Sequence, residues 1–331
     1  MRRRLSSIIV IAILLSLLIA LIGCGKTESN NGGIESDIAA DIDAKVGTWK
    51  TPQTIQPFFY QNYLHNGDSV EVLPFTNPGD MKTALLAGSL DMCGTTIVTA
   101  ITAASKGEPI VLVAGLSNKC SALVVGKDSG IETGSDLKGK KIAYVPGTMH
   151  HLLLLEVLAK NGIDSEKDVE LIRIDFFDMG QALAQGVIDA FYSGEPYPST
   201  AVADGFGKIL LYPDDEDGFG IINSAMMTTK AKVEKEKDLI SKLVSAHVKA
   251  TEELGKNREM WIEKSLEFGT EKEILDIALD NVQLFWNIDD DYLDSVAKLA
   301  QRMFDQGLIT EIPDVGEMFD LSFINNLETD I

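Results

Sequence analysis

Short apolar runs and amphipathic segments alternate along residues 45–211, and this alternation predicts the fold class. An unbroken apolar run at 110–114 is typical of a strand that is buried on both faces. The alternation indicates βαβ units, and therefore an α/β fold with mainly parallel sheets and helices on both faces. Strands are expected at 45–49, 70–75, 91–95, 110–114, 122–125, 142–145, 169–174, 190–193 and 208–211, and helices at 54–64, from 78 onward, at 97–105, 149–160 and 200–203.

One phrase occurs twice in this pattern. The frame M-x-x-A-L-x-x-G-x-x-D is found at Met81–Asp91 and again at Met179–Asp189. Each copy predicts a short helix that ends at a glycine, where a positive φ causes no Cβ clash, and a strand follows each copy. Two such units predict two similar lobes that face each other across a ligand cleft. The alternative is a chance match, because alanine, leucine and glycine are common residues.

These units divide the body of the chain into two lobes that are joined by two hinge crossings. We expect residues 44–125 and 220–331 to form the first lobe and residues 126–219 to form the second. The acidic stretch Asp214–Asp217 precedes a strand expected at 221–227, which returns the chain to the first lobe. The C-terminal region is predicted to be helical, with amphipathic segments at 233–256, 258–268, 271–285 and 291–306.

The first residues predict export and lipid attachment. Three arginines precede an apolar run at Ile8–Ile22, which is shorter than the about 20 residues of a membrane-spanning helix and suits a signal-peptide core. The run ends in Leu21-Ile22-Gly23-Cys24, the lipobox pattern of prokaryotic lipoproteins. We therefore expect a signal peptide at 1–23, a lipid on Cys24 and a flexible leash at 24–43. An uncleaved anchor helix is the alternative; in both cases the protein is extracytoplasmic and anchored to the cell membrane.

The charge balance argues against one large class of partner. The chain has 29 Lys and Arg against 50 Asp and Glu, and removal of residues 1–23 takes away three arginines, so the mature charge is 26 minus 50, or −24. A surface this acidic repels nucleic acid, so we expect no nucleic-acid partner. We also expect the protein to be a monomer. With Cys24 lipidated, Cys93 and Cys120 remain, which permits either one disulfide or two free thiols.

Several segments, taken in their order and spacing, resemble one family. They are ALLAGSLDMCGTT, DLKGKKIAYVPGT before a leucine-rich helix, and DMGQALAQGVIDAFYSGEP, placed between the lipobox and a helical tail. Over about residues 44–330 the chain is similar to ABC-transporter solute-binding lipoproteins of the nitrate/sulfonate/bicarbonate/taurine group, which also includes binders of thiamine-pyrimidine precursors. The resemblance implies a two-lobed, periplasmic-binding-protein-like fold of type II that traps a small molecule and delivers it to an ABC permease with its ATPase.

The resemblance also limits the ligand. It implies a small oxyanion or sulfonate, such as nitrate, bicarbonate, taurine or an alkanesulfonate, and a pyrimidine-type heterocycle is the alternative. A tethered sensor, or an enzyme similar to the pyrimidine synthase of thiamine biosynthesis, is an alternative of a different class. We favour a binding protein that is not an enzyme, because the cysteine-rich motif of that synthase is missing. The sequence also contains no G-x-S-x-G, H-E-x-x-H, phosphate-loop or dinucleotide motif.

Five segments that follow predicted strands are candidates for the ligand site, because ligands of open α/β sheets bind beyond the carboxyl ends of the strands. Gly147 and Thr148 begin a predicted helix, whose free backbone N–H groups and positive dipole end suit an anionic oxygen. Thr95 and Thr96 offer the same arrangement from the opposite lobe. The candidate ligand-binding residues are Lys50, Thr51, Gln53, Cys93, Gly94, Thr95, Thr96, Asn118, Gly147, Thr148, Met149, His150 and Glu195.

The two adjacent histidines do not predict a metal site. His150 and His151 point in different directions from a helix, so only one of them can face the cleft. Helical metal ligands need the i,i+4 spacing, which these residues lack. We therefore expect no metal and no cofactor, and His150 is expected either to hydrogen-bond the ligand or to face solvent.

Other candidates also have a structural alternative. Glu195 either accepts a hydrogen bond from the ligand or pairs with a lysine or arginine across the closed lobes. Lys50 either supplies a counter-charge to an anion or is simply exposed. The aromatic side chains of Trp49 and of residues 58–60 either stack on a ring of the ligand or belong to the core.

Overall fold

The computed structural model describes residues 42–213 and 221–328. The expected signal peptide, Cys24, nearly all of the expected leash and the acidic stretch Asp214–Asp217 lie outside the described residues. Within the two described ranges, no helix is long and apolar enough to cross a membrane.

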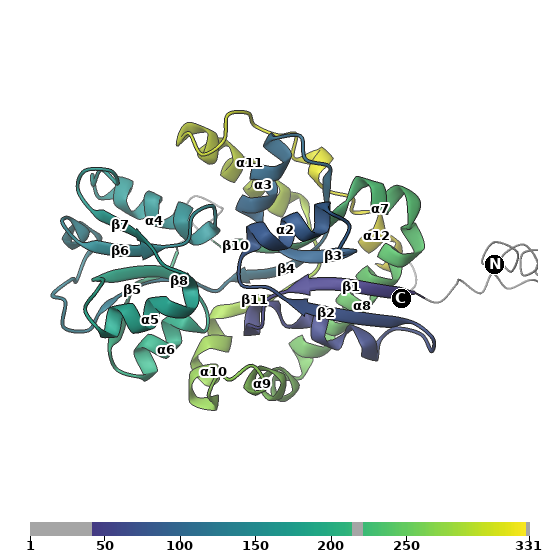
Figure 1. The fold of residues 1–331 in the computed structure, drawn as a ribbon, viewed down its shortest axis with the longest axis horizontal. Helices are drawn as coiled ribbons and strands as arrows, with labels where there is room; N and C mark the ends of the chain where they lie inside the picture. Colours follow the sequence, from purple (N-terminus) through teal and green to yellow (C-terminus); the bar gives the residue numbers. More distant parts are fainter. Residues whose placement is uncertain (1–41, 214–220, 329–331) are drawn as a thin grey trace, which may run out of the picture. The chain divides into compact units, whose positions relative to one another are not determined.

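The first of two β-sheets has six strands. These are β1 (Asp43–Thr48), β2 (Ser69–Pro74), β3 (Met92–Thr96), β4 (Ile110–Lys119), β10 (Ile222–Thr229) and β11 (Val282–Leu284). Their order across the sheet is β11-β4-β10-β3-β1-β2 (Figure 1). β1 runs parallel to both of its neighbours, whereas β10 is antiparallel to β3 and β4, and β11 is antiparallel to β4.

The second sheet has five strands. These are β5 (Ser121–Gly126), β6 (Lys141–Tyr144), β7 (Glu170–Arg173), β8 (Ala190–Gly194) and β9 (Gly207–Leu211), in the order β7-β6-β8-β5-β9. β6 runs parallel to both neighbours and β5 runs antiparallel to both. Helix α4 (Met149–Lys160) covers one face, and α5 (Phe176–Ala184) and α6 (Tyr197–Ala203) cover the other (Figure 1).

The α/β architecture with two sheets is confirmed, but each sheet is mixed rather than mainly parallel. The reason lies in the strands that connect the sheets. β5 directly follows β4 across the first crossing, and β10 returns the chain to the first sheet. Each of these two strands inserts antiparallel between two others, β5 between β8 and β9 and β10 between β3 and β4. As a result β5, which we expected in the first lobe up to residue 125, hydrogen-bonds to β8 and β9 of the second sheet.

The first crossing between the sheets takes place at Lys119 and Cys120. Their φ angles are 60° and 65°, a left-handed conformation that non-glycine residues rarely adopt. Neighbouring segments hold the turn in place, because the backbone N–H of Cys120 donates to the carbonyl oxygen of Asn281 and the carbonyl of Cys120 accepts from the N–H of Glu195, each at 2.8 Å. The crossing is therefore fixed by the end of β8 and by the segment before β11.

The two copies of the repeated phrase form equivalent helices. The first copy lies in α2 (Pro78–Leu86) and the second in α5. Both helices end as predicted before a glycine with positive φ, which is 75° at Gly88 and 70° at Gly186. Pro78 begins α2, and the side chain of Asn77 accepts hydrogen bonds from the first free N–H groups of that helix.

The aspartate that closes each copy explains why the phrase recurs. The Asp91 carboxylate accepts a hydrogen bond from the backbone N–H of Lys45 at 2.7 Å, and the Asp189 carboxylate accepts one from the N–H of Lys141 at 2.8 Å. Lys45 lies in β1 and Lys141 lies in β6, and each of these strands runs parallel to both of its neighbours. Each aspartate thus ties its repeat to the corresponding strand. The repeat is structural and is not a chance match.

The helix expected at 54–64 is wrong, because this segment forms two 3-10 helices, Pro52–Thr54 and Gln56–Asn62. Prolines at 52 and 57 lack the N–H that an α-helix uses. The second 3-10 helix packs on α8 (Lys237–Lys256), where the Tyr60 hydroxyl lies 2.9 Å from Nδ1 of His247. Of the two alternatives for residues 58–60, the structure supports the core one for Tyr60, which is fully buried.

The C-terminal region is helical as expected, except for β11, which lies inside the predicted helix 271–285. Most buried apolar side chains form one cluster, which surrounds the first sheet and continues between the second sheet and α4. A smaller cluster, centred on Phe191, lies between the second sheet and helices α5 and α6. The remaining helices are α3 (Ile97–Ser105), α7 (Lys230–Lys235), α9 (Arg258–Leu266), α10 (Lys272–Ala278), α11 (Asp290–Asp305) and α12 (Ser322–Glu328), with 3-10 turns at 134–137, 279–281 and 316–318.

Candidate functional site

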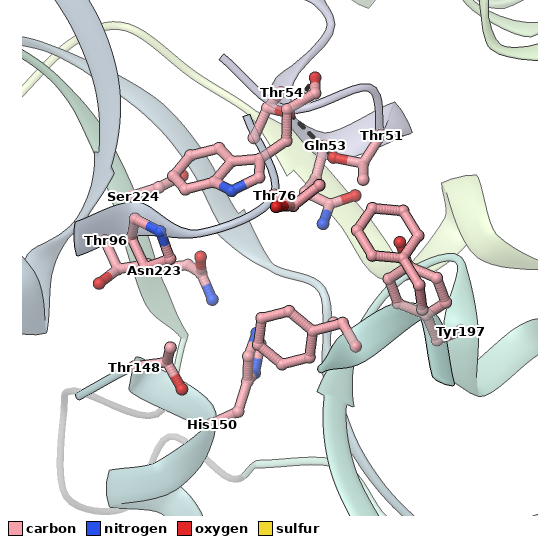
Figure 2. Close-up of a pocket in the computed structure, with 15 residues that line it drawn as sticks. Thr51, Gln53, Thr54, Thr76, Thr96, Thr148, His150, Tyr197, Asn223 and Ser224 are labelled. Carbon is pink, nitrogen blue, oxygen red and sulfur yellow. Dashed lines mark hydrogen bonds between the residues drawn. The ribbon is translucent and has the colours of Figure 1, made fainter. Parts of the chain in front are cut away.

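A pocket lies where the carboxyl ends of parallel strands from the two sheets meet (Figure 2). Its walls enclose about 580 Å³, including open solvent at the mouth. The side of the first sheet contributes Trp49, Thr51, Gln53, Thr54, Thr76, Pro78, Thr96, Asn223 and Ser224, and the side of the second sheet contributes Thr148, His150, Phe176, Phe177, Gly194 and Tyr197.

The loop that follows β1 is held rigidly by threonine hydroxyls. The Thr54 hydroxyl donates to the carbonyl oxygen of Trp49 at 3.0 Å and lies 2.9 Å from the Thr51 hydroxyl oxygen. The Thr48 hydroxyl donates to the carbonyl of Thr54 at 2.9 Å. These local bonds fix the positions of Trp49 and Gln53 on the pocket wall.

Two helices begin at the pocket, one from each side. Thr96 caps α3 by accepting a hydrogen bond from the Thr99 N–H at 3.1 Å, and Thr148 caps α4 by accepting one from the His151 N–H at 3.3 Å. The Thr99 hydroxyl donates to the carbonyl oxygen of Gly147 at 3.3 Å, so the two helix starts lie close together. Gly147 has a φ of +71°, which permits the tight turn before α4.

Of the two adjacent histidines, His150 faces the pocket. Its side chain is 7% exposed, its Nδ1 lies 3.1 Å from the Ser121 hydroxyl, and its ring meets Phe176 edge-on with centroids 5.3 Å apart. Burial lowers the pKa of His150 to about 4, so the ring is neutral at neutral pH. His151 instead packs its ring against Tyr144, with centroids 4.6 Å apart.

Aromatic rings form a large part of the wall on the side of the second sheet. Phe176 and Tyr197 stack with centroids 6.4 Å apart, and Phe177 meets Tyr197 edge-on at 5.5 Å. Phe177 is 53% exposed, which places it at the rim. The indole of Trp49 contributes a further ring from the other side.

The polar groups that line the pocket are uncharged. They are threonine, serine and tyrosine hydroxyls, the indole N–H of Trp49, the amides of Gln53 and Asn223 and the neutral imidazole of His150. No lining residue within the described ranges is a lysine, arginine, aspartate or glutamate. The Oε1 atom of Gln53 is buried and has no hydrogen-bond partner in the described part of the chain. A buried acceptor of this kind can accept a hydrogen bond from a bound molecule or from an ordered water.

Five of the predicted site residues lie together on the pocket wall: Thr51, Gln53, Thr96, Thr148 and His150. They come from three segments, the loop after β1 and the starts of α3 and α4, as expected from the rule that strand ends converge. Trp49, for which stacking on a ligand was one of the two alternatives, also lies on the wall.

The other candidates lie elsewhere. Lys50 is exposed and does not line the pocket. Thr95 is 1% exposed, and its hydroxyl donates to the carbonyl of Thr96 at 3.3 Å. Gly94 lies behind the wall, since a Cβ there would be 3.1 Å from the Trp49 ring. Cys93 and Met149 are core residues, Asn118 is buried in β4, and Gly147 contributes only the turn described above.

Glu195 lies at the crossing between the sheets and is 1% exposed. Its carboxylate accepts a hydrogen bond from the Asn281 side-chain amide at 2.9 Å and one from the Ser199 N–H at 3.2 Å. Burial raises the pKa of this carboxyl. Its partners are therefore an amide and a backbone N–H, rather than the lysine or arginine that we considered, and Glu195 does not line the pocket.

The two described cysteines are free thiols. Both are buried, and burial raises the pKa of each thiol. Cys93 lies in β3 beside Gly47 and Met227, whereas Cys120 forms the crossing. Of the two possibilities that the sequence left open, the structure has the reduced one.

Sequence reasoning missed the aromatic wall and the start of β10. Phe176, Phe177 and Tyr197 follow strands β7 and β8, so the rule that found Thr96 and Thr148 could also have found them. We considered aromatic stacking only for Trp49 and residues 58–60. Asn223 and Ser224 lie at the beginning of an antiparallel strand, and the rule covers only the carboxyl ends of parallel strands. Thr54, Thr76, Pro78 and Gly194 complete the residues that were not predicted.

Most residues that line the pocket lie in a region that matches a known family. The model of the family described as NMT1/THI5 like matches residues 62–259, which is more than half of the chain. The chain belongs to the NMT1/THI5-like family. The match includes α3, α4 and the second sheet with their pocket residues, whereas the loop that carries Trp49 and Gln53 precedes it.

Curated relatives match the chain over part of their length. Over 133 residues the chain is 33% identical to a putative aliphatic sulfonates-binding protein of Escherichia coli (strain K12), which covers 39% of this chain and 41% of that protein. Over 143 residues it is 30% identical to a 4-amino-5-hydroxymethyl-2-methylpyrimidine phosphate synthase of Schizosaccharomyces pombe, covering 42% of this chain and 40% of that protein. The chain thus spans about two fifths of the length of these relatives.

Solved structures share the architecture. The alkanesulfonate-binding protein SsuA from Xanthomonas axonopodis pv. citri, bound to MOPS, superposes with a TM-score of 0.74 and 19% identity, covering 86% of this chain and all of that one. A similarity at this level of identity concerns the fold alone. It confirms the periplasmic-binding-protein-like fold that the resemblance implied.

Proposed function

We propose that this protein is an extracytoplasmic solute-binding protein that closes on a small molecule and delivers it to an ABC permease with its ATPase. The first lobe would comprise the six-stranded sheet with the C-terminal helices. The second would comprise the five-stranded sheet, with β5 added to the residues 126–219 that the sequence suggested. The pocket supports this proposal, because residues of both sheets line it and the chain crosses between the sheets beside it. Relatives that are named as binding proteins support it as well.

Contacts across the proposed lobes are consistent with a closing motion. The Thr99 hydroxyl on α3 reaches the Gly147 carbonyl, and Glu156 on α4 contacts both Arg302 of α11 and Gln306 directly after it. The Glu156 carboxylate lies 3.3 Å from Nε of Arg302. In such a protein the ligand shifts an equilibrium between open and closed forms by binding the closed form more tightly.

For the ligand, the pocket favours a flat, uncharged heterocycle such as an aminopyrimidine. The observation that carries this choice is the pairing of aromatic walls with uncharged polar groups. Trp49 lies on one side and Phe176 and Tyr197 lie on the other. The neutral His150 and the amides of Gln53 and Asn223 line the same pocket. Aromatic rings stack on heterocycles, and the unpaired Oε1 of Gln53 suits an exocyclic amino group. The name of the fission-yeast relative contains a pyrimidine of this kind.

A small oxyanion or sulfonate is the second candidate. One observation favours it, namely that α3 and α4 begin at the same place, where Thr99 contacts Gly147. Backbone N–H groups at two helix starts can bind an anion without a basic side chain. Lys50 was considered as a counter-charge for an anion. It favours neither ligand class, because it does not line the pocket.

Calorimetry with the mature protein tests the ligand class. We expect binding of 2-methylpyrimidin-4-amine and weaker or no binding of nitrate, bicarbonate and taurine. Trp49→Ala should weaken pyrimidine binding by about 1–3 kcal/mol, roughly 5- to 150-fold, because one stacking wall is lost. Phe304→Ala is the matched control, since Phe304 is 42% exposed and lies away from the pocket. Binding of an oxyanion with no response to the pyrimidine would replace this ligand class with the second candidate.

Membrane attachment is a separate part of the proposal. We expect Cys24 to carry the lipid, because it follows an apolar run and completes a lipobox. Cys24→Ala should abolish labelling by a fatty-acid analogue and leave an uncleaved precursor in cells. Cys93→Ala is the control, since Cys93 is a buried core thiol. Normal labelling and processing of the Cys24→Ala form would refute this attachment point.

A further inference from the structure

The imidazole of His150 has one nitrogen in contact with the protein and the other at the pocket. Nδ1 lies 3.1 Å from the Ser121 hydroxyl oxygen. On the opposite edge of the ring stands Gly194, where an added Cβ would lie 3.1 Å from both Cε1 and Nε2. His150 lies on the pocket wall (Figure 2). Because Gly194 lines the same pocket and has no side chain, this residue leaves the Nε2 edge of the ring uncovered.

A neutral imidazole has one nitrogen that donates a hydrogen bond and one that accepts. Which nitrogen carries the hydrogen is set by the partner of the other. For His150 that partner is Ser121, the first residue of β5 after the crossing between the sheets. The hydrogen-bond direction at Ser121 therefore determines what His150 offers to a ligand.

The surroundings of Ser121 favour one direction. Ser121 is 3% exposed, and the Asn223 side-chain amide donates to its oxygen at 3.4 Å. If Nδ1 of His150 also donated to this oxygen, the hydroxyl hydrogen would be left without a strong acceptor. The neighbouring thiol of Cys120 is only a weak acceptor. A buried donor without a partner lowers the stability of the folded state. A hydroxyl that accepts from Asn223 and donates to Nδ1 has both its oxygen and its hydrogen in hydrogen bonds.

We propose that Asn223 and Ser121 form a hydrogen-bond relay that places the ring hydrogen of His150 on Nε2, so that His150 acts as a donor toward the ligand. Ser121 is then a positioning residue that acts through His150. The consequence for specificity rests on the proposed function. A ligand must bring an acceptor, such as a ring nitrogen with a free lone pair, to the space beside Gly194, and an analogue with C–H at that position is disfavoured.

The tautomer can be measured in the protein without any ligand. Nitrogen-15 NMR of protein with labelled histidine rings reports which nitrogen carries the hydrogen. The His150 signals are identified among those of the four histidines by their loss in His150→Gln. We expect the Nε2–H form of His150 in the wild type and a substantial Nδ1–H population in Ser121→Ala. Ser117→Ala is the matched control, because this buried serine bonds to Ser224 and does not contact His150.

Two results would overturn the relay. One is an Nδ1–H form of His150 in the wild type, and the other is an unchanged spectrum in Ser121→Ala. Asn223→Leu provides a second variant of similar size, which removes the amide donor and should also shift the tautomer. A shift in Asn223→Leu supports the relay even if Ser121→Ala does not fold.

Calorimetry then connects the tautomer to specificity. The probes are 2-methylpyrimidin-4-amine and 3-methylaniline, in which both ring nitrogens are replaced by C–H. We expect the wild type to prefer the pyrimidine by roughly 5- to 150-fold, because the aniline leaves the buried Nε2–H unpaired. In Ser121→Ala this preference should fall to a few-fold, while affinity for the aniline changes little. If neither probe binds but the spectra are as expected, the proposed ligand class fails and the relay stands.

Discussion

Replacement of Phe191 by alanine is expected to lower the free energy of unfolding by about 3–5 kcal/mol, because a fully buried ring is removed from a small cluster that cannot easily close the cavity. Phe191 lies in β8 and packs with residues from α5 and α6, including Met179, Leu183 and Ala201. This cluster is separate from the main core, so the second sheet has few other apolar contacts on that face. Urea unfolding followed by circular dichroism measures the change.

A second phenylalanine of the same region serves as the control. Phe177 is 53% exposed at the rim of the pocket, so Phe177→Ala should change stability by no more than about 0.5 kcal/mol. It should nevertheless weaken binding of the pyrimidine probe, because Phe177 holds Tyr197 edge-on. We therefore expect Phe191→Ala to lower stability without removing a ligand contact. We expect Phe177→Ala to weaken probe binding with little change in stability. Equal stability losses would contradict the assignment of the two rings.

Acidification from about pH 7.5 to about pH 5 is expected to destabilise the protein by about 2 kcal/mol for each of two buried histidines. Burial lowers the pKa of both His150 and His247 to about 4, whereas an unfolded histidine titrates near 6.5. Between these values the unfolded chain binds protons that the folded chain does not. The contribution to stability is therefore fully present above about pH 6.5 and is lost as the pH falls toward 4.

Glu195 acts in the opposite direction, because its raised pKa lets the folded chain take up a proton before the unfolded chain does. Variants separate these contributions in urea unfolding at several pH values. His247→Gln should remove about half of the acid sensitivity, while the exposed His65→Gln serves as the control. A pH dependence that is unchanged in both His150→Gln and His247→Gln would show that other groups cause the acid sensitivity.

The sequence by itself determined the positions of most strands and helices and the helix ends in the two copies of the repeated phrase. Strand and helix periodicities are local, so the alternation along residues 45–211 located most strands and helices, and the glycines at 88 and 186 marked the helix ends. It failed at residues 54–64, where Pro57 interrupts an apolar pattern. It could not determine strand directions, because these depend on where the chain crosses between sheets, and that turn at Lys119 and Cys120 uses residues with no special preference for positive φ.

For the site, the sequence predicted the residues whose position depends on local geometry. Thr96 and Thr148 cap helices directly after strands, and this arrangement is visible in a short segment. Only the tertiary structure decided that Phe176 and Tyr197 line the pocket and that Ser121 and Asn223 reach His150. An aromatic side chain on a helix is equally compatible with a core and with a binding wall, and a hydrogen bond between residues far apart in the chain exists only once the packing of both sheets brings them together.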